Sequence, residues 1–227
     1  MPIWSMALFG SRARGDDEPN SDIDLLFITD EAKPRLINSN RMSCSFYPSS
    51  HLFSKAEEGD LFVLHLVREA KIFYDEKGDF DDMSKAFRFK ESYAPTIEQA
   101  SSLGSFILEH REAFDDASLA NKRIAWCVRT ILIARAADVG RAIFAARALA
   151  EFAGEAIVEE LIQNKAAPLL SPAMLLNFRK FLNRWGQSDI AEASSIKAYL
   201  QHFRRTGNAV GLRTYFASRD SFSGLYE

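Results

Sequence analysis

Two short stretches decide the fold of this 227-residue chain: Gly10-Ser11-Arg12-Ala13-Arg14-Gly15 and Ser21-Asp22-Ile23-Asp24-Leu25. An apolar run over residues 3–9 precedes the first stretch, and the second stretch opens another run over residues 22–28. Short apolar runs that end at a glycine or a polar cluster predict buried strands. We therefore expect two strands joined by a polar connection.

The first stretch has the composition of a phosphate-binding turn. Gly10 tolerates the backbone geometry of a tight turn and the close approach of an anion. Ser11 adds a hydroxyl group, and Arg12 and Arg14 offer charge-assisted hydrogen bonds. Taken alone, a Gly-Ser pair after a strand is most often only a turn.

The second stretch places two carboxylates close together. Asp22 and Asp24 are two residues apart on a predicted strand, so their side chains emerge on one face. Neighbouring carboxylates repel each other, and a divalent cation between them relieves the repulsion. An Asp-x-Asp pair by itself is usually a solvated strand edge, but its position after the glycine turn favours a joint metal and phosphate site. The spacing fits neither a calcium-binding loop nor a Walker phosphate loop.

The pattern Gly-Ser-x-Ala-Arg-Gly followed by Ser-Asp-x-Asp-Leu resembles the signature of the minimal nucleotidyltransferases of the DNA polymerase β-like superfamily. That superfamily includes the aminoglycoside nucleotidyltransferases and the antitoxins of two-gene toxin–antitoxin pairs. The resemblance covers residues 3–78 and implies an α+β fold with a mixed sheet. It also implies transfer of a nucleoside monophosphate from an NTP, such as ATP, to an acceptor hydroxyl on a small molecule, protein or RNA.

The resemblance assigns roles to individual residues. Asp22 and Asp24 would be catalytic and would bind magnesium, with two Mg²⁺ ions in a fully active enzyme. The implied nucleotide-binding residues are Gly10, Ser11, Arg14 and Ser21.

A third carboxylate, which the family takes from its next strand, is missing here. The matching strand is expected over residues 42–47, where Ser43 and Ser45 stand in place of an acid. Apolar neighbours flank Ser45, so we expect Ser45 first and Ser43 second at this position. Asp60 and Glu69 are the nearest substitutes in sequence, although a structural role is favoured for both. The alternative function is a catalytically weakened nucleotide-binding or antitoxin-like interaction module.

Composition divides the chain near Pro95. Residues 1–96 carry 12 basic and 17 acidic side chains, whereas residues 97–227 carry 16 and 14. We expect a nucleotidyltransferase domain over residues 1–95 and an all-α helical bundle over residues 96–227. The first domain should also hold a helix over residues 51–68, with Gly59 as a weak point, and a strand over residues 70–74. The bundle should hold helices over residues 97–114, 120–140, 144–163, 172–185 and 188–205.

Several classes of protein are excluded. Hydrophobic residues make up 47% and charged residues 26%, as in globular proteins, and the net charge of −3 opposes a strongly basic nucleic-acid platform. Cys44 and Cys127 are too few and too far apart for a zinc site. No apolar run is long enough to span a bilayer. We expect a cytoplasmic protein that binds an NTP and an unknown acceptor. A further protein partner, such as a toxin or a defence-system component, is also consistent with the resemblance.

Overall fold

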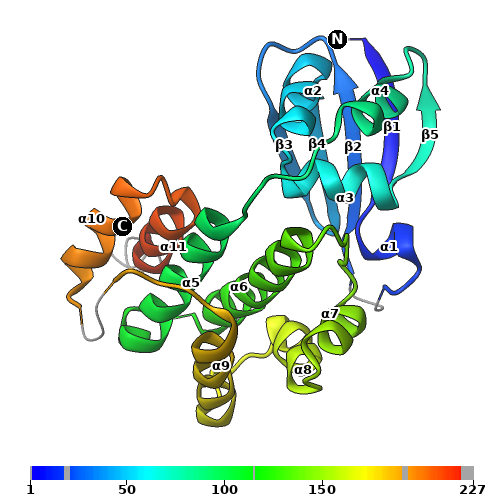
Figure 1. Ribbon diagram of the computed structural model, residues 1–227. Helices are drawn as coiled ribbons and strands as arrows, with labels where there is room; N and C mark the ends of the chain where they lie inside the picture. The colour runs from blue at the N-terminus through cyan, green and yellow to red at the C-terminus, as the bar shows by residue number, and fades with distance from the viewer. Residues whose placement is uncertain (1, 18–20, 115, 191–193, 221–227) are drawn as a thin grey trace. The chain divides into compact units, whose positions relative to one another are not determined.

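The computed structural model describes residues 2–17, 21–114, 116–190 and 194–220 (Figure 1). The chain forms two compact units. Unit 1 contains Met1–Glu91 together with Gly140–Ala145, and unit 2 contains Ser92–Val139 and Ala146–Glu227. The segment Gly140–Ala145 was expected in the helical domain, but it groups with the sheet.

Unit 1 is built on a mixed five-stranded sheet in the order β3-β4-β2-β1-β5. Strands β2 and β4 are parallel, and the other neighbouring pairs are antiparallel. The strands are β1 (Ile3–Phe9), β2 (Ile23–Thr29), β3 (Arg35–Ser39), β4 (Met42–Pro48) and β5 (Lys71–Asp75).

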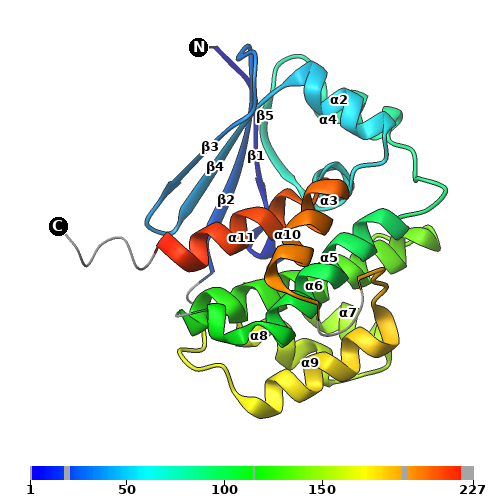
Figure 2. The ribbon, with the colours of Figure 1, turned by 90° about the vertical axis from the view of Figure 1, so that its left-hand side faces the viewer.

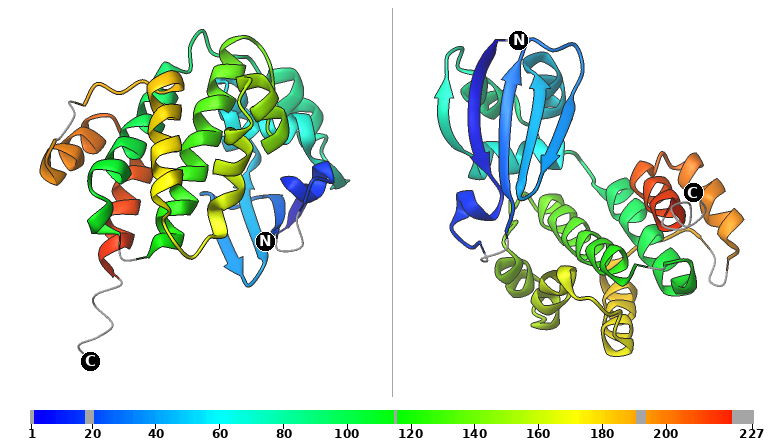
Figure 3. Two further views of the ribbon diagram at one scale, coloured as in Figure 1. Left: turned by 90° about the horizontal axis from the view of Figure 1, so that it is seen from below. Right: turned by 180° about the vertical axis from the view of Figure 1, so that it is seen from behind.

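Three helices cover one face of the sheet: α2 (Ser49–Glu57), α3 (Leu61–Glu69) and α4 (Asp79–Ala86). Figure 2 shows them on one side of the strands, and in the right panel of Figure 3 the sheet lies in front of them. Leu26 and Ile28 point into the core beneath these helices. Because side chains alternate along a strand, the same face receives Asp24, near the start of β2.

Unit 2 contains helices and no strand in the part that the structure describes. Helix α9 packs against both α5 and α6 (Figure 3, left), and the buried rings of Phe106, Tyr199 and Phe203 join α5 to α10. Its helices are α5 (Ala94–Glu109), α6 (Ala117–Asp138), α7 (Ala146–Ala153), α8 (Ile157–Gln163), α9 (Pro172–Trp185), α10 (Ile196–Arg205) and α11 (Ala209–Asp220), with short 3-10 turns at Arg111–Ala113 and Asn164–Ala166. The α+β sheet followed by a helical region confirms the predicted fold class.

The predicted strands agree with β1, β2, β4 and β5 to within one residue. The expected helix over residues 51–68 is instead two helices, α2 and α3, separated at Gly59. Gly59 has a φ of +67°, which glycine adopts without strain, and Asp60 begins α3 by accepting hydrogen bonds from two backbone N–H groups. The chain therefore changes direction at Gly59, and two shorter helices form in place of one long helix.

Other elements were not expected. All five residues of β3 are exposed, so this edge strand lacks the apolar alternation that reveals a strand. Helices α4 and α11 were also missed, and the helix predicted over residues 144–163 is divided into α7 and α8 around Gly154. The helix predicted over residues 188–205 begins only at Ile196 in α10, and residues 191–193 lie outside the described residues. Among the helices of the described ranges, none combines the length and apolarity needed to cross a bilayer.

Candidate active site

The centre of the candidate site is the contact between Gly10 and the Asp24 carboxylate. Phe9, the last residue of β1, pairs with Asp24 across the antiparallel β1–β2 ladder, so Gly10 leaves the sheet beside Asp24. Gly10 has φ +78° and ψ −160°. A Cβ atom on Gly10 would lie 2.6 Å from Asp24 Oδ2. The absence of a side chain at residue 10 thus leaves the space that the carboxylate fills.

Gly10 leads directly into α1 (Ser11–Arg14), a single helical turn (Figure 1). The N–H groups of Ala13 and Arg14 both donate to the Gly10 carbonyl, at 3.1 and 3.2 Å. Ser11 is half-buried, and its carbonyl accepts from the Gly15 N–H at 2.8 Å. These bonds give the turn one defined shape, in which Ser11 directly follows Gly10.

Two arginines hold the backbone just before the acidic pair. Arg12 Nη2 donates to the Ser21 carbonyl at 2.9 Å, and Arg41 Nη2 donates to the same oxygen at 3.3 Å. Arg12 also pairs with Asp17 at 3.1 Å. Ser21 is buried, whereas Asp22 is exposed immediately before β2. Arg12 therefore stabilises the segment that joins the Gly10 turn to β2.

Arg14 lies in an ion-pair cluster. Its Nη1 is 2.8 Å from Glu69 Oε2 on α3, its Nε is 3.1 Å from Asp16 Oδ1, and its side chain is 13% exposed. Burial by itself would lower the pKa of the guanidinium, but the hydrogen bonds to Glu69 and Asp16 outweigh burial and raise it. Arg14 is therefore always charged, and its expected contact with phosphate stays a prediction.

Strand β4 shows which serine lies beside the acidic pair. In the parallel β2–β4 ladder, Asp24 is opposite Ser43, whereas Leu26 is opposite Ser45. Both serines lie on the helix-covered face, but Ser45 is buried beside the core. The register thus puts Ser43 next to Asp24, the reverse of the order expected from flanking apolar residues.

The two substitute acids are engaged elsewhere. Asp60 accepts from the N–H groups of Phe62 and Val63 at the start of α3 and pairs with Lys55 at 2.7 Å. Glu69 pairs with Arg14 and with His65, both at 2.8 Å. These contacts give both acids structural roles. In the residues that the structure describes, no group of three His, Cys, Asp or Glu side chains is placed to hold a metal ion.

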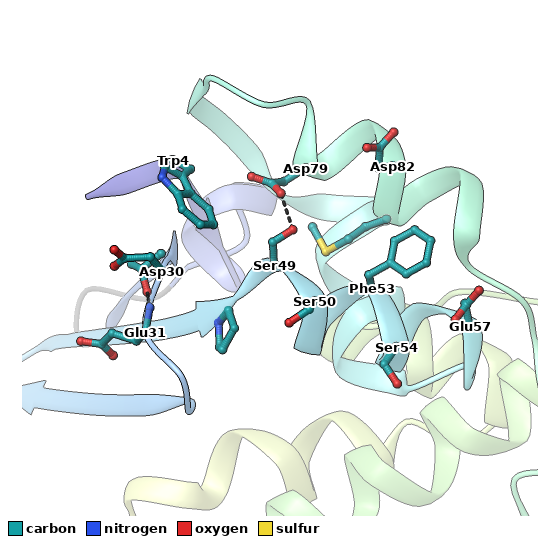
Figure 4. A pocket seen from close by; sticks show the side chains of 13 residues that line it. Trp4, Asp30, Glu31, Ser49, Ser50, Phe53, Ser54, Glu57, Asp79 and Asp82 are labelled. Carbon is teal, nitrogen blue, oxygen red and sulfur yellow. Dashed lines mark hydrogen bonds between the residues drawn. The ribbon is translucent and has the colours of Figure 1, made fainter. Parts of the chain in front are cut away.

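A separate pocket opens at the other end of the sheet, beyond Thr29 and Pro48 (Figure 4). It has a volume of about 590 Å³. Thr29 is five residues from Asp24, or roughly 16 Å along an extended strand. No local pattern in the sequence indicates this pocket, because its walls come from four separate segments of the chain. The lining residues are Trp4, Thr29, Asp30, Glu31, Pro48, Ser49, Ser50, Phe53, Ser54, Glu57, Asp79, Asp82 and Met83.

Comparison with known proteins agrees with the motif geometry. Residues 2–94 match the family model described as a nucleotidyltransferase domain. A nucleotidyltransferase-like protein from Exiguobacterium sibiricum 255-15 is among the similar solved structures, with 14% identity, a TM-score of 0.35, and coverage of 90% of this chain and 71% of that chain. No curated protein matches the sequence. Residues 2–94 are thus similar to a nucleotidyltransferase domain, and a helical C-terminal region follows them.

Proposed function

We propose that unit 1 binds an NTP together with magnesium and transfers its nucleoside monophosphate to an acceptor hydroxyl. The observation that carries this proposal is the contact between Gly10 and Asp24. It brings the glycine that begins the turn next to a carboxylate on the neighbouring strand. Phosphoryl-type transfer depends chiefly on positioning and charge neutralisation, and this pair of strands supplies groups for both.

The donor groups suit one magnesium ion shared with the phosphates. Magnesium is commonly held by one or two carboxylates plus substrate phosphates, and it retains several waters. Asp24 beside Gly10 and Asp22 immediately before β2 are the residues that would hold it. Bound there, the ion would neutralise charge on the phosphates and orient them. Gly10 and Ser11 would contact the phosphates themselves.

A second candidate function is nucleotide binding with slow or no transfer, as in an antitoxin-like interaction module. The observation in its favour is Ser43 opposite Asp24 in β4. A serine hydroxyl offers no negative charge for a second metal ion. It is also a poor proton acceptor compared with a carboxylate, and general base catalysis typically contributes about 10²–10⁴-fold. We therefore expect nucleotide binding to be intact and transfer to be weak.

Isothermal titration tests the metal and nucleotide site directly. A non-hydrolysable ATP analogue is titrated into the wild type and Asp22→Asn, with and without magnesium. Asp30→Asn is the matched control, because Asp30 is also exposed but follows the opposite end of β2. Asp22→Asn should weaken magnesium-dependent binding by about tenfold or more, since the ligand charge falls by one. Equal magnesium-dependent affinity in all three proteins would contradict the assignment.

A second assay separates the two candidate functions. The full chain is incubated with radiolabelled NTPs, magnesium, and fractionated small molecules, proteins and RNA from a cell extract. Transfer of label that depends on Asp22 would support the enzyme, and the labelled fraction would reveal the class of acceptor. Nucleotide binding without labelled product would favour the interaction module and its protein partner.

A further inference from the structure

One aromatic residue of unit 1 comes from far along the chain. Phe144 lies in the segment Gly140–Ala145, between helices α6 and α7, and this segment groups with the nucleotidyltransferase unit. The Phe144 side chain is 3% exposed. Its ring stacks on His65 of α3, with centroids 4.6 Å apart and planes at 25°. The buried surroundings of α3 therefore include a residue that lies beyond the family match to residues 2–94.

His65 connects this ring to the turn at Gly10 in two ways. Its ring meets Phe9 edge-on, with centroids 5.9 Å apart, and Phe9 is the residue immediately before Gly10. Its Nε2 lies 2.8 Å from Glu69 Oε2, the same oxygen that accepts from Arg14 Nη1 at 2.8 Å. Arg14 is the last residue of α1. His65 thus contacts Phe9, and it reaches Arg14 in two ways: its Nε2 lies 3.3 Å from Arg14 Nη1, and both side chains pair with Glu69.

We propose that Phe144 is a positioning residue of the nucleotide site, acting through His65 and Glu69 to hold the turn Gly10–Arg14 in shape. The inference rests on the function proposed above for that turn. The physical basis is restriction of the His65 ring. A stacked partner on one side and the Phe9 edge on another leave the imidazole few orientations, so Glu69 stays aligned with Arg14. Removal of the Phe144 ring would let the His65 ring reorient. The contact between Glu69 and Arg14 at the end of α1 would then weaken.

A structural role alone would lower the overall stability without singling out this turn. The proposal instead requires a local effect on four amides. The N–H groups of Ala13 and Arg14 donate to the Gly10 carbonyl, and those of Gly15 and Asp16 donate to the Ser11 carbonyl. Their hydrogen-exchange rates report the opening of the turn directly, in the absence of any nucleotide.

The test compares Phe144→Leu with Phe114→Leu in the full chain. Phe114 is a matched control, because it is 8% exposed and belongs to unit 2. We expect Phe144→Leu to speed exchange of the four amides by up to about tenfold, the range that loss of an aromatic pair produces. The Phe114→Leu rates should stay within about twofold of the wild type. Urea denaturation of each variant checks that both remain folded.

A double-mutant cycle tests whether Phe144 acts through Glu69. Glu69→Gln should also speed exchange of the turn amides, because it removes the charge that holds Arg14. Phe144→Leu should then add little in the Glu69→Gln background, since residues of one network are not additive. Fully additive effects on the exchange rates would overturn the proposed route.

Nucleotide affinity completes the test. Phe144→Leu should weaken binding of the magnesium–ATP analogue in parallel with the faster exchange, while Phe114→Leu should not. Unchanged exchange in Phe144→Leu would overturn the inference, as would faster exchange with unchanged nucleotide affinity. Faster exchange in a protein whose wild type binds no nucleotide would refute the proposed function and leave Phe144 as the anchor of the turn.

Discussion

Substitution of Gly10 by alanine is the sharpest perturbation of the proposed site. Two separate costs arise at this residue. The backbone at φ +78° and ψ −160° lies in a region that is essentially restricted to glycine, and a side chain there costs about 1–3 kcal/mol. The new Cβ atom would also lie 2.6 Å from Asp24 Oδ2. Ordinary van der Waals contact begins at 3.4 Å, so the carboxylate must retreat by roughly 0.8 Å.

Such a retreat is large for a metal ligand. Magnesium demands near-octahedral geometry with oxygen atoms at about 2.0–2.1 Å, and a displacement near 1 Å in an active site can cost about 10²-fold. Gly10→Ala should therefore weaken magnesium-dependent NTP binding by roughly 10- to 100-fold. It should also lower the free energy of unfolding of unit 1 by about 2–3 kcal/mol.

Gly15→Ala is the matched control for backbone strain. Gly15 also has a positive φ, +81°, but a Cβ atom there has nothing within 4 Å. We expect a loss of about 1–2 kcal/mol in unfolding free energy and nucleotide affinity close to that of the wild type. Urea denaturation and isothermal titration with a non-hydrolysable ATP analogue measure both quantities. If Gly10→Ala binds the analogue as tightly as Gly15→Ala does, the contact with Asp24 is not part of a nucleotide site.

Three other experiments test the position of Ser43, the turn at Gly59 and the burial of Cys127. Ser43→Asp should raise the rate of any NTP transfer, by up to about 10²–10⁴-fold if the new carboxylate acts as a base; an unchanged rate in the labelled-NTP assay would contradict the register argument. Gly59→Ala should lower the free energy of unfolding, measured by urea denaturation, by more than about 2 kcal/mol. The positive φ of residue 59 and the collision of the new Cβ atom with the Arg88 carbonyl both contribute, and wild-type stability would refute this. Burial raises the pKa of the Cys127 thiol, so the stability that this thiol contributes is fully present below about pH 8.5, the unfolded value, and is lost as the pH rises further. Iodoacetamide at about pH 8.5 should therefore label Cys44 well before Cys127 in the native protein. Equal labelling rates of the two thiols, measured by mass spectrometry, would contradict the burial of Cys127.

Local signals in the sequence were enough to predict most of the sheet and the place of the motifs. Strands β1 and β2 are apolar runs that end at Gly10 or begin at the acidic pair, and both features lie within a few residues of the motifs themselves. The two-residue alternation of a strand also predicts Asp22 and Asp24 on one face, and the structure has Asp24 in β2 with Asp22 immediately before it. Strand β3 escaped prediction because an exposed edge strand does not need apolar side chains.

The site required information that no local pattern contains. Ser43 rather than Ser45 lies beside Asp24, because the pairing of β2 with β4 depends on side chains and connections along both strands. Phe144 reaches His65 across 79 positions of sequence, since burial of apolar surface selects partners by their position in space. The sequence by itself therefore determined which chemical groups the turn and β2 carry. The tertiary structure decided which groups face them, because strand register and core packing are settled by the folded chain as a whole.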